Sequence, residues 1–259
     1  MTEQGGISQS GQFPETADIE TSSDNYAKRF AGSIGKWMLH VQETIAIKFL
    51  KDRDSASVLD VGGGHGQLTI PMCRENFRVT VLSSSQACRK RIAQVVDNGQ
   101  CTFLVGNVID LPFPDNSFDS VICFRLVTHC VKWQKLISEL CRVARHSVIV
   151  DYPTSQSFNK IAPWLFKAKK KVEGDTRKWA LFRHNDINRE FIKHGFILNN
   201  RNGQFFLPMV LHRALKCRTL SAAIEGIFRR LGISKRWGSP VIIEMVRNAG
   251  NGKVLLKIK

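Results

Sequence analysis

A glycine-rich segment lies between residues 58 and 69 of the chain. A short apolar stretch ends at Asp60, and glycines then stand at Gly62, Gly64 and Gly66 before an amphipathic stretch resumes. This order predicts a strand, a tight turn and the start of a helix. Alternate glycines let the backbone take positive φ and let a ligand approach the main chain, while the helix start offers free N–H groups. The segment therefore predicts a cradle for a small cofactor.

The glycine spacing separates the candidate cofactors. The dinucleotide fingerprint G-x-G-x-x-G would need a glycine at Gln67, whereas the chain reads G-x-G-x-G. With Asp60 before it, this pattern resembles motif I of the class I S-adenosylmethionine-dependent methyltransferases, and the resemblance implies S-adenosylmethionine as the cofactor. A βα turn without a ligand is the alternative at this point.

A second motif occupies residues 106–119, which read GNVIDLPFPDNSFD. It closely resembles the run G-D-A-x-x-L-P-F-P-D-N-S-F-D of methyltransferases related to ubiquinone and menaquinone biosynthesis. The resemblance implies that the Asn107 side chain and the Val108 N–H face the adenine. Asn107 stands where that family has an aspartate, but its amide oxygen can still accept a hydrogen bond from the adenine amine.

Two histidines are candidate catalytic groups. His129 lies in a segment that resembles the one after the fourth strand of the same family, where it matches the second of two histidines. A histidine there could orient a substrate or take a proton, or it could cap the next helix. His184, at an expected helix start, is a second candidate base and is equally suited to a structural role. In the same segment Phe124 and Arg125 are expected beside the cofactor, although Arg125 could instead brace the loop.

One position departs from the family pattern. After the second strand the family carries an acid that accepts both ribose hydroxyls, and here only serines follow, beginning with Ser83. A hydroxyl makes a weaker hydrogen bond than a carboxylate, so a lower cofactor affinity or a shifted register is expected. The basic residues 89–91 could bind the 2′-phosphate of NADP, so an NADP site is an alternative. The glycine spacing at 62–66 and the motif at 106–119 disfavour it.

The elements expected around these motifs alternate between strands and helices. Strands are expected at 58–61, 77–82, 101–105, 120–124 and 147–150, with late strands at 196–206 and 240–246. Helices are expected at 24–50 (one broken or two short), 67–75, 86–96, 132–145 and 208–231. The alternation predicts an α/β fold with a doubly wound, mostly parallel sheet that binds ligands at the carboxyl ends of its strands. The resemblance implies seven strands in a Rossmann-like methyltransferase fold, with a late antiparallel strand and a C-terminal helical insertion.

The domain boundaries follow from composition. The polar residues 1–23 are expected to be disordered, and 24–259 form one methyltransferase domain, in which 155–235 include basic insertions facing substrate or membrane. The seven cysteines stand singly, and neither zinc-ligand spacing nor a Glu/Glu/His group is evident, so reduced thiols and no metal are expected. Without an 18-residue apolar run or a signal peptide, the protein is expected to be cytoplasmic.

The positive charge is confined to the C-terminal part. Residues 1–159 hold 16 basic and 16 acidic side chains, whereas residues 160–259 hold 22 basic and 6 acidic ones. In 155–171 and 208–231 apolar residues lie beside lysines and arginines, which is typical of a helix at an anionic membrane. Helices packed on the sheet with their charges outward would give the same pattern, and RNA binding is less favoured.

These observations predict methyl transfer from S-adenosylmethionine to a small or lipid-like acceptor, with peripheral contact to an anionic membrane. A non-catalytic module that binds RNA or membrane, or an RNA methyltransferase, is the alternative.

Overall fold

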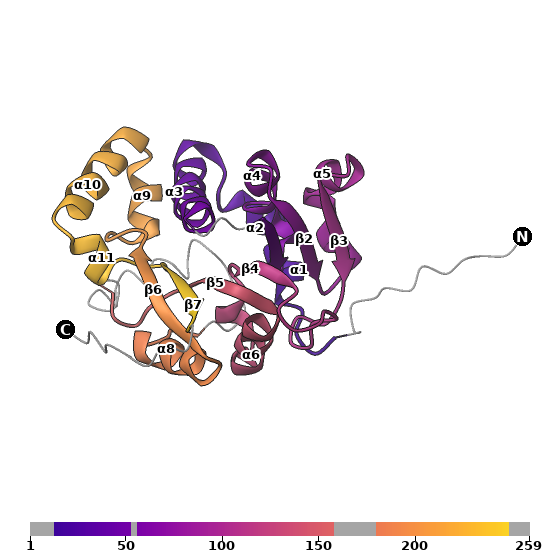
Figure 1. Cartoon of the computed structure of the whole chain (residues 1–259). Helices are drawn as coiled ribbons and strands as arrows, with labels where there is room; N and C mark the ends of the chain where they lie inside the picture. The colour runs from indigo at the N-terminus through magenta and orange to yellow at the C-terminus, as the bar shows by residue number, and fades with distance from the viewer. Residues whose placement is uncertain (1–12, 53–55, 158–179, 249–259) are drawn as a thin grey trace, which may run out of the picture.

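The computed structural model describes residues 13–52, 56–157 and 180–248. Its centre is one seven-stranded sheet in the order β3-β2-β1-β4-β5-β7-β6 (Figure 1). The strands are β1 (Ser57–Val61), β2 (Arg78–Ser83), β3 (Cys101–Val105), β4 (Phe118–Cys123), β5 (Ala144–Tyr152), β6 (Phe196–Gly203) and β7 (Val241–Arg247). Strands β1 to β5 pair in parallel, and β7 runs antiparallel to both β5 and β6. The predicted Rossmann-like methyltransferase fold is confirmed.

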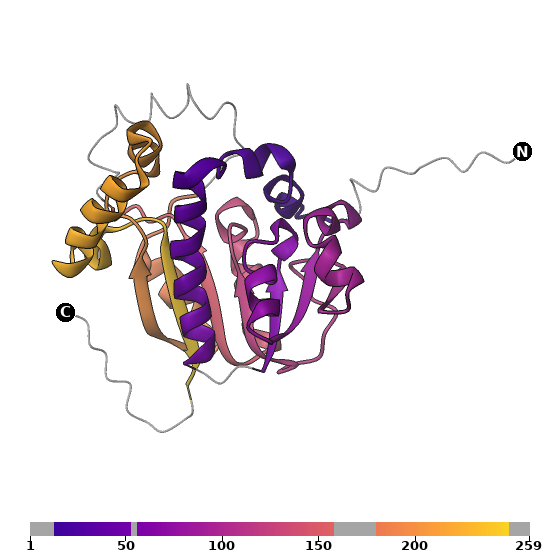
Figure 2. The same ribbon diagram turned by 90° about the horizontal axis from the view of Figure 1, so that it is seen from above.

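Helices flank the sheet and extend beyond it. They are α1 (Ala17–Thr21), α2 (Asp24–Lys28), α3 (Gly32–Lys51), α4 (Thr69–Arg74), α5 (Ala93–Asp97), α6 (Trp133–Val143), α8 (His184–Lys193), α9 (Met209–Leu215), α10 (Arg218–Arg230) and α11 (Ile233–Trp237). Short 3₁₀ turns are η1 (Gly63–His65), η2 (Gln86–Arg91) and η3 (Val127–His129). Figure 2 shows the indigo N-terminal helices lying across one end of the strands.

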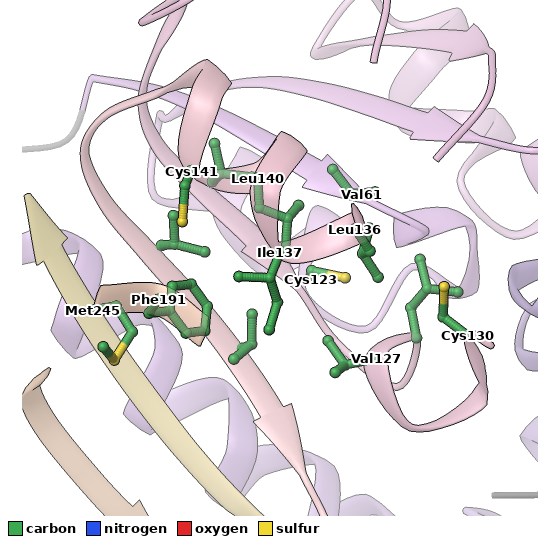
Figure 3. Packing of buried hydrophobic residues seen from close by; sticks show 14 of the residues in the cluster. Val61, Cys123, Val127, Cys130, Leu136, Ile137, Leu140, Cys141, Phe191 and Met245 are labelled. Atoms are coloured by element: carbon green, nitrogen blue, oxygen red, sulfur yellow. The ribbon is translucent and has the colours of Figure 1, made fainter. Parts of the chain in front are cut away.

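Both faces of the sheet are buried at its central strands, as is typical of a parallel sheet covered by helices on both sides. In β4, Val121 and Cys123 point to the face covered by α6 and α8, whereas Ile122 points to the face of α3 and α4. Figure 3 shows the first of these clusters, where Ile137 and Leu140 of α6 pack near Phe191 of α8. Alternate residues of one strand therefore pack against the two helix layers.

The N-terminal segment differs from the expectation. Residues 13–23 lie within the described part of the chain and include α1, whose Ala17 and Asp18 are buried. The expected helix at 24–50 is two helices, since Ala31 is extended before α3. Much of the basic segment at 155–171 lies outside the described residues.

Helices α9 to α11 form a small unit organised by one buried carboxylate. Glu225 of α10 is 0% exposed, and it accepts hydrogen bonds from the backbone N–H groups of Phe206 and Leu207, both at 2.9 Å. His212 of α9 lies 3.0 Å from the same carboxylate and Ser234 of α11 lies 3.4 Å from it. One side chain thus ties the loop after β6 to all three helices.

Among the described residues, no helix is both long and apolar enough to span a bilayer, and no group of three or more His, Cys, Asp and Glu side chains could hold a metal ion. All seven cysteines are free thiols.

Candidate cofactor site

The glycine turn has the geometry that its sequence requires. Gly62 and Gly66 have φ of +78° and +73°, values at which the backbone of a residue with a side chain would be strained. Gly63 must lack a side chain because a Cβ would lie 2.2 Å from the carboxyl carbon of Asp60. A Cβ on Gly64 would lie 2.5 Å from the Cβ of Cys88 in η2, so Gly64 is required by packing within the chain.

Asp60 lies beneath this turn and is 0% exposed. Its Oδ2 accepts a 2.7 Å hydrogen bond from Thr69 Oγ1 at the start of α4. Burial raises the pKa of Asp60 to about 7, and the Thr69 hydrogen bond opposes that rise. The carboxyl is therefore easily protonated in the isolated chain, and a nearby cation would favour its charged form.

Several buried polar atoms around the turn have no hydrogen-bond partner among the described residues, and they include Asp60 Oδ1, Gln67 Oε1 and Ser83 Oγ. Burial of such atoms is unfavourable unless a ligand or water satisfies them. The oxygens of the ionised Asp60 carboxylate and of the Gln67 amide can only accept hydrogen bonds, which suits a ligand with hydrogen-bond donors, such as an ammonium group. In this respect the residues fit the amino-acid end of S-adenosylmethionine.

A polar cluster lies where β4 and β5 end. Arg125, directly after β4, has a φ of +60°, and its N–H donates a 2.6 Å hydrogen bond to Oδ1 of Asp151. Gln42 of α3 donates to Asp151 Oδ2 at 2.9 Å and accepts from Arg125 Nη2 at 3.3 Å. A non-glycine residue at positive φ costs about 1 kcal/mol or more, so these contacts hold Arg125 in a strained backbone position.

Aromatic rings of α2 and the residues after it cover this cluster. The Arg125 guanidinium lies 4.3 Å from the centre of the Phe30 ring and 5.5 Å from that of Tyr26. Burial raises the pKa of Asp151 to about 6 and Arg125 opposes the rise. Arg125 thus both braces the loop and presents a cation under an aromatic cover, next to the carboxyl ends of the central strands.

The other expected cofactor residues lie around the same edge of the sheet. Asn107 follows β3 and its Oδ1 accepts from the N–H of Ile109 at 3.2 Å, which closes a local turn. Val108 is buried in the cluster beneath α6, and Phe124 is buried with the residues under α3 and α4. Because the side chains of Val108 and Phe124 pack in the core, only the backbone groups of these two residues are placed to meet a ligand.

The two candidate bases differ in access. His129 ends η3 beyond β4 and is half-buried. His184 is 6% exposed, its Nδ1 lies 2.9 Å from the hydroxyl of Tyr152, and burial lowers its pKa to about 4. His184 is therefore held neutral within the packing of α8 against β5.

Helix α1 lies between the glycine turn and the end of β2. The carboxylate of Asp18 accepts hydrogen bonds from the Ser84 N–H at 2.6 Å and from Ser84 Oγ at 2.5 Å. A Cβ on Gly62 would lie 3.5 Å from the Cβ of Asp18. Sequence reasoning missed Asp18, because it stands in a polar segment with no motif, and it missed Gln42, because a single polar residue in an amphipathic helix gives no sign of a functional role.

The comparisons with known proteins agree with this geometry. Residues 59–150 match the family model described as "Methyltransferase domain". The chain is 29% identical over 131 residues to a demethylmenaquinone methyltransferase of Symbiobacterium thermophilum, covering 48% of this chain and 51% of that protein. It is 24% identical over 159 residues to 24-methylenesterol C-methyltransferase 2 of Arabidopsis thaliana, covering 59% of this chain and 41% of that protein. The chain thus spans about half the length of these curated relatives.

Among solved structures, magnesium protoporphyrin IX methyltransferase from Synechocystis PCC 6803 with bound SAH (S-adenosylhomocysteine) is similar in fold. The TM-score is 0.61 at 17% identity, with 87% of this chain and 94% of that chain covered. The same protein with bound S-adenosylmethionine gives a TM-score of 0.59 at 16% identity, with 91% and 99% covered.

Proposed function

We propose that the protein transfers a methyl group from S-adenosylmethionine to a small or lipid-like acceptor, starting from the match of residues 59–150 to the methyltransferase-domain family model. The observation that carries the proposal is the set of unpartnered buried atoms of Asp60, Gln67 and Ser83 around the glycine turn. They lie at the point where β1 separates β2 from β4, which is where open α/β sheets bind their ligands.

The residues present have complementary roles toward this cofactor. Asp60 and Gln67 would accept hydrogen bonds from its ammonium group, and the Asn107 side chain and the Val108 N–H would face its adenine, as the resemblance implies. Arg125 would lie beside its carboxylate. When bound, S-adenosylmethionine supplies a methyl group on a sulfonium that any well-placed nucleophile can accept.

The chain itself contributes positioning and exclusion of water. Helix α2 and the rings of Tyr26 and Phe30 cover the carboxyl edge of the sheet above Arg125. Where the acceptor has to lose a proton, we propose His129 as the base, because the ring of His184 is held against Tyr152.

A cavity of about 600 Å³ beside this cover supports an acceptor with an anionic group. Among the described residues, its lining includes the cations of Lys28, Arg29, Arg213 and Lys216 and no acidic side chain. The cavity lies between the α2–α3 turn and α9, so a charged end held there would leave the remainder of the acceptor near Arg125.

The outer surface of α10 supports contact with a membrane. Leu220, Ile227 and Leu231 are spaced by seven and four residues, so they share one helix face, and they are 48%, 57% and 67% exposed. The face that α10 turns inward includes two buried polar residues, Ser221 and Glu225. Figure 1 shows α10 at the margin of the molecule.

Exposed basic residues also lie on α10 and in the segments next to it, namely Lys216, Arg218, Arg229, Arg230, Lys235 and Arg236. An apolar stripe with a cationic border is how an interfacial helix binds anionic lipid. We therefore propose a cytoplasmic protein that touches an anionic membrane through α10. This position would bring a lipid-like acceptor to the cavity beside α9.

Binding and turnover test the proposal separately. Calorimetry with SAH should show binding to the wild-type protein and weaker binding to Asn107→Ala, with Asn248→Ala beyond β7 as the control. Methylation of a lipid extract by isotope-labelled S-adenosylmethionine should then identify the acceptor. Absence of SAH binding refutes the proposed cofactor site, and binding without turnover of any acceptor favours the non-catalytic alternative.

A further inference from the structure

The N-terminal segment Glu15–Asp24 crosses the carboxyl edge of the sheet. At one end Glu15 Oε1 accepts from the N–H of Lys132 at 2.9 Å, just before α6. At the other end Asp24 pairs with Lys90 at 2.8 Å and with Arg91 at 2.7 Å, both in η2. The segment is therefore fastened on both sides of the glycine turn, beyond β4 and beyond β2.

Between these two attachments, Asp18 is fully buried. A carboxylate is buried only where donors satisfy it, and here the two Ser84 donors and the Cys88 thiol, at 3.6 Å, surround it. The Arg91 side chain also donates to the backbone carbonyl of Ser22 at 2.9 Å. The contacts of α1 are thus specific and include charged hydrogen bonds, which are stronger than neutral ones.

A nucleoside held by the glycine turn and by the residues after β2 has to lie between these two strand ends. Asp18 occupies that space, since it contacts Ser84 and lies near Gly62. It also takes the Ser84 N–H that a nucleoside acceptor would otherwise use. After β2, where the family carries an acidic residue, this chain has the two hydrogen-bond donors of Ser84. The carboxylate at this place is that of Asp18, from α1.

We propose that α1 is an internal competitor of the cofactor, with Asp18 as the residue that holds it in place. Binding of S-adenosylmethionine requires α1 to leave the space between Gly62 and Ser84. The apparent affinity is then lowered by the fraction of molecules in which α1 occupies the site. This inference rests on the proposed function, because it takes the site to be the S-adenosylmethionine site.

Replacement of Asp18 tests the competition in the full chain. Asp18→Ala removes the hydrogen bonds to Ser84, so SAH should bind roughly tenfold more tightly, which corresponds to about 1.4 kcal/mol. Asp52→Ala, at an exposed site beyond the far end of α3, is the matched control and should bind as the wild type does. Weaker binding by Asp18→Ala would show that Asp18 is part of the cofactor site, and unchanged binding would show no competition; either overturns the proposal.

A reversible lock provides the second test. Because Cys88 Sγ lies 3.6 Å from Asp18 Oδ2, Asp18→Cys brings two thiols together for oxidation to a disulfide. The oxidised protein should not bind SAH, and reduction should restore binding, whereas Asp18→Cys with Cys88→Ser should bind under both conditions. Binding by the oxidised, cross-linked form would refute the competition. If neither the wild type nor any variant binds SAH, the proposed function fails together with the competition. If the wild type binds SAH but the oxidised Asp18→Cys protein binds it equally well, only the competition fails.

Discussion

The buried carboxyl of Asp60 gives the fold a measurable dependence on pH. Its pKa is about 7 in the folded chain against 3.8 for an ordinary aspartate, and the cause is burial. Between these two values the folded state holds a proton that the unfolded state has lost. The free energy of unfolding therefore falls as pH rises through this range.

The size of the effect follows from the shift. Each pH unit between the two pKa values changes the unfolding free energy by about 1.4 kcal/mol, so the loss from pH 5 to pH 8 is on the order of 3 kcal/mol. Asp60→Asn removes this titration while its amide oxygen can still accept from Thr69. Relative to the wild type, the variant should gain on the order of 3 kcal/mol between pH 5 and pH 8.

Urea unfolding of both proteins at the two pH values measures this double difference, in which other titrating groups cancel. Asp52→Asn, an exposed carboxamide beyond α3, should differ from the wild type by the same amount at both pH values. A difference between Asp60→Asn and the wild type that does not change with pH would refute the burial argument.

Three further outcomes are expected. Gly64→Val should lower the unfolding free energy by roughly 1–3 kcal/mol in urea titrations, because its side chain would meet Cys88, whereas a role limited to ligand contact would leave stability unchanged. His184→Gln should reduce the loss of stability between pH 6.5 and pH 4. In this range the histidine takes up a proton in the unfolded wild type but not in the folded one, where its pKa is about 4, and unfolding curves of the variant with the same pH dependence as the wild type would contradict this. Ile227→Asp should weaken sedimentation with anionic vesicles by about tenfold, from lost apolar burial and added charge, while Ile192→Asp, equally exposed on α8, should not; equal effects would argue against the α10 surface.

The sheet was predictable from the sequence because its strands are short apolar runs between turn residues. The expected strand at 101–105 is β3, and the expected strand at 58–61 lacks only Ser57 of β1. The last two strands were also expected in the right places. The antiparallel direction of β7 was expected from the family resemblance, since hydrophobic periodicity contains no information on strand direction.

The surroundings of the cofactor site were less predictable. The glycine turn and the loop containing Asn107 have local signatures, so their residues could be named from spacing. Asp18 and Gln42 reach the site from distant segments through side-chain contacts that no local pattern encodes. The expectation that residues 1–23 lack structure did not include α1, because a five-residue helix in a polar segment has too few apolar residues to show a period.

The dependence of α9 to α11 on Glu225 has a consequence for how the chain opens. These helices pack on α3 through a small apolar cluster with Phe205 and Met209, and one buried carboxylate joins all three of them to the loop after β6. Such a unit is expected to unfold locally at a lower free energy than the strands, as separate cooperative units do in amide hydrogen exchange. The part of the protein proposed to meet the acceptor would then exchange its amide hydrogens early, whereas the strands that carry the glycine turn would stay protected. Selection could therefore reshape acceptor recognition in these helices with little effect on the strands beneath the cofactor.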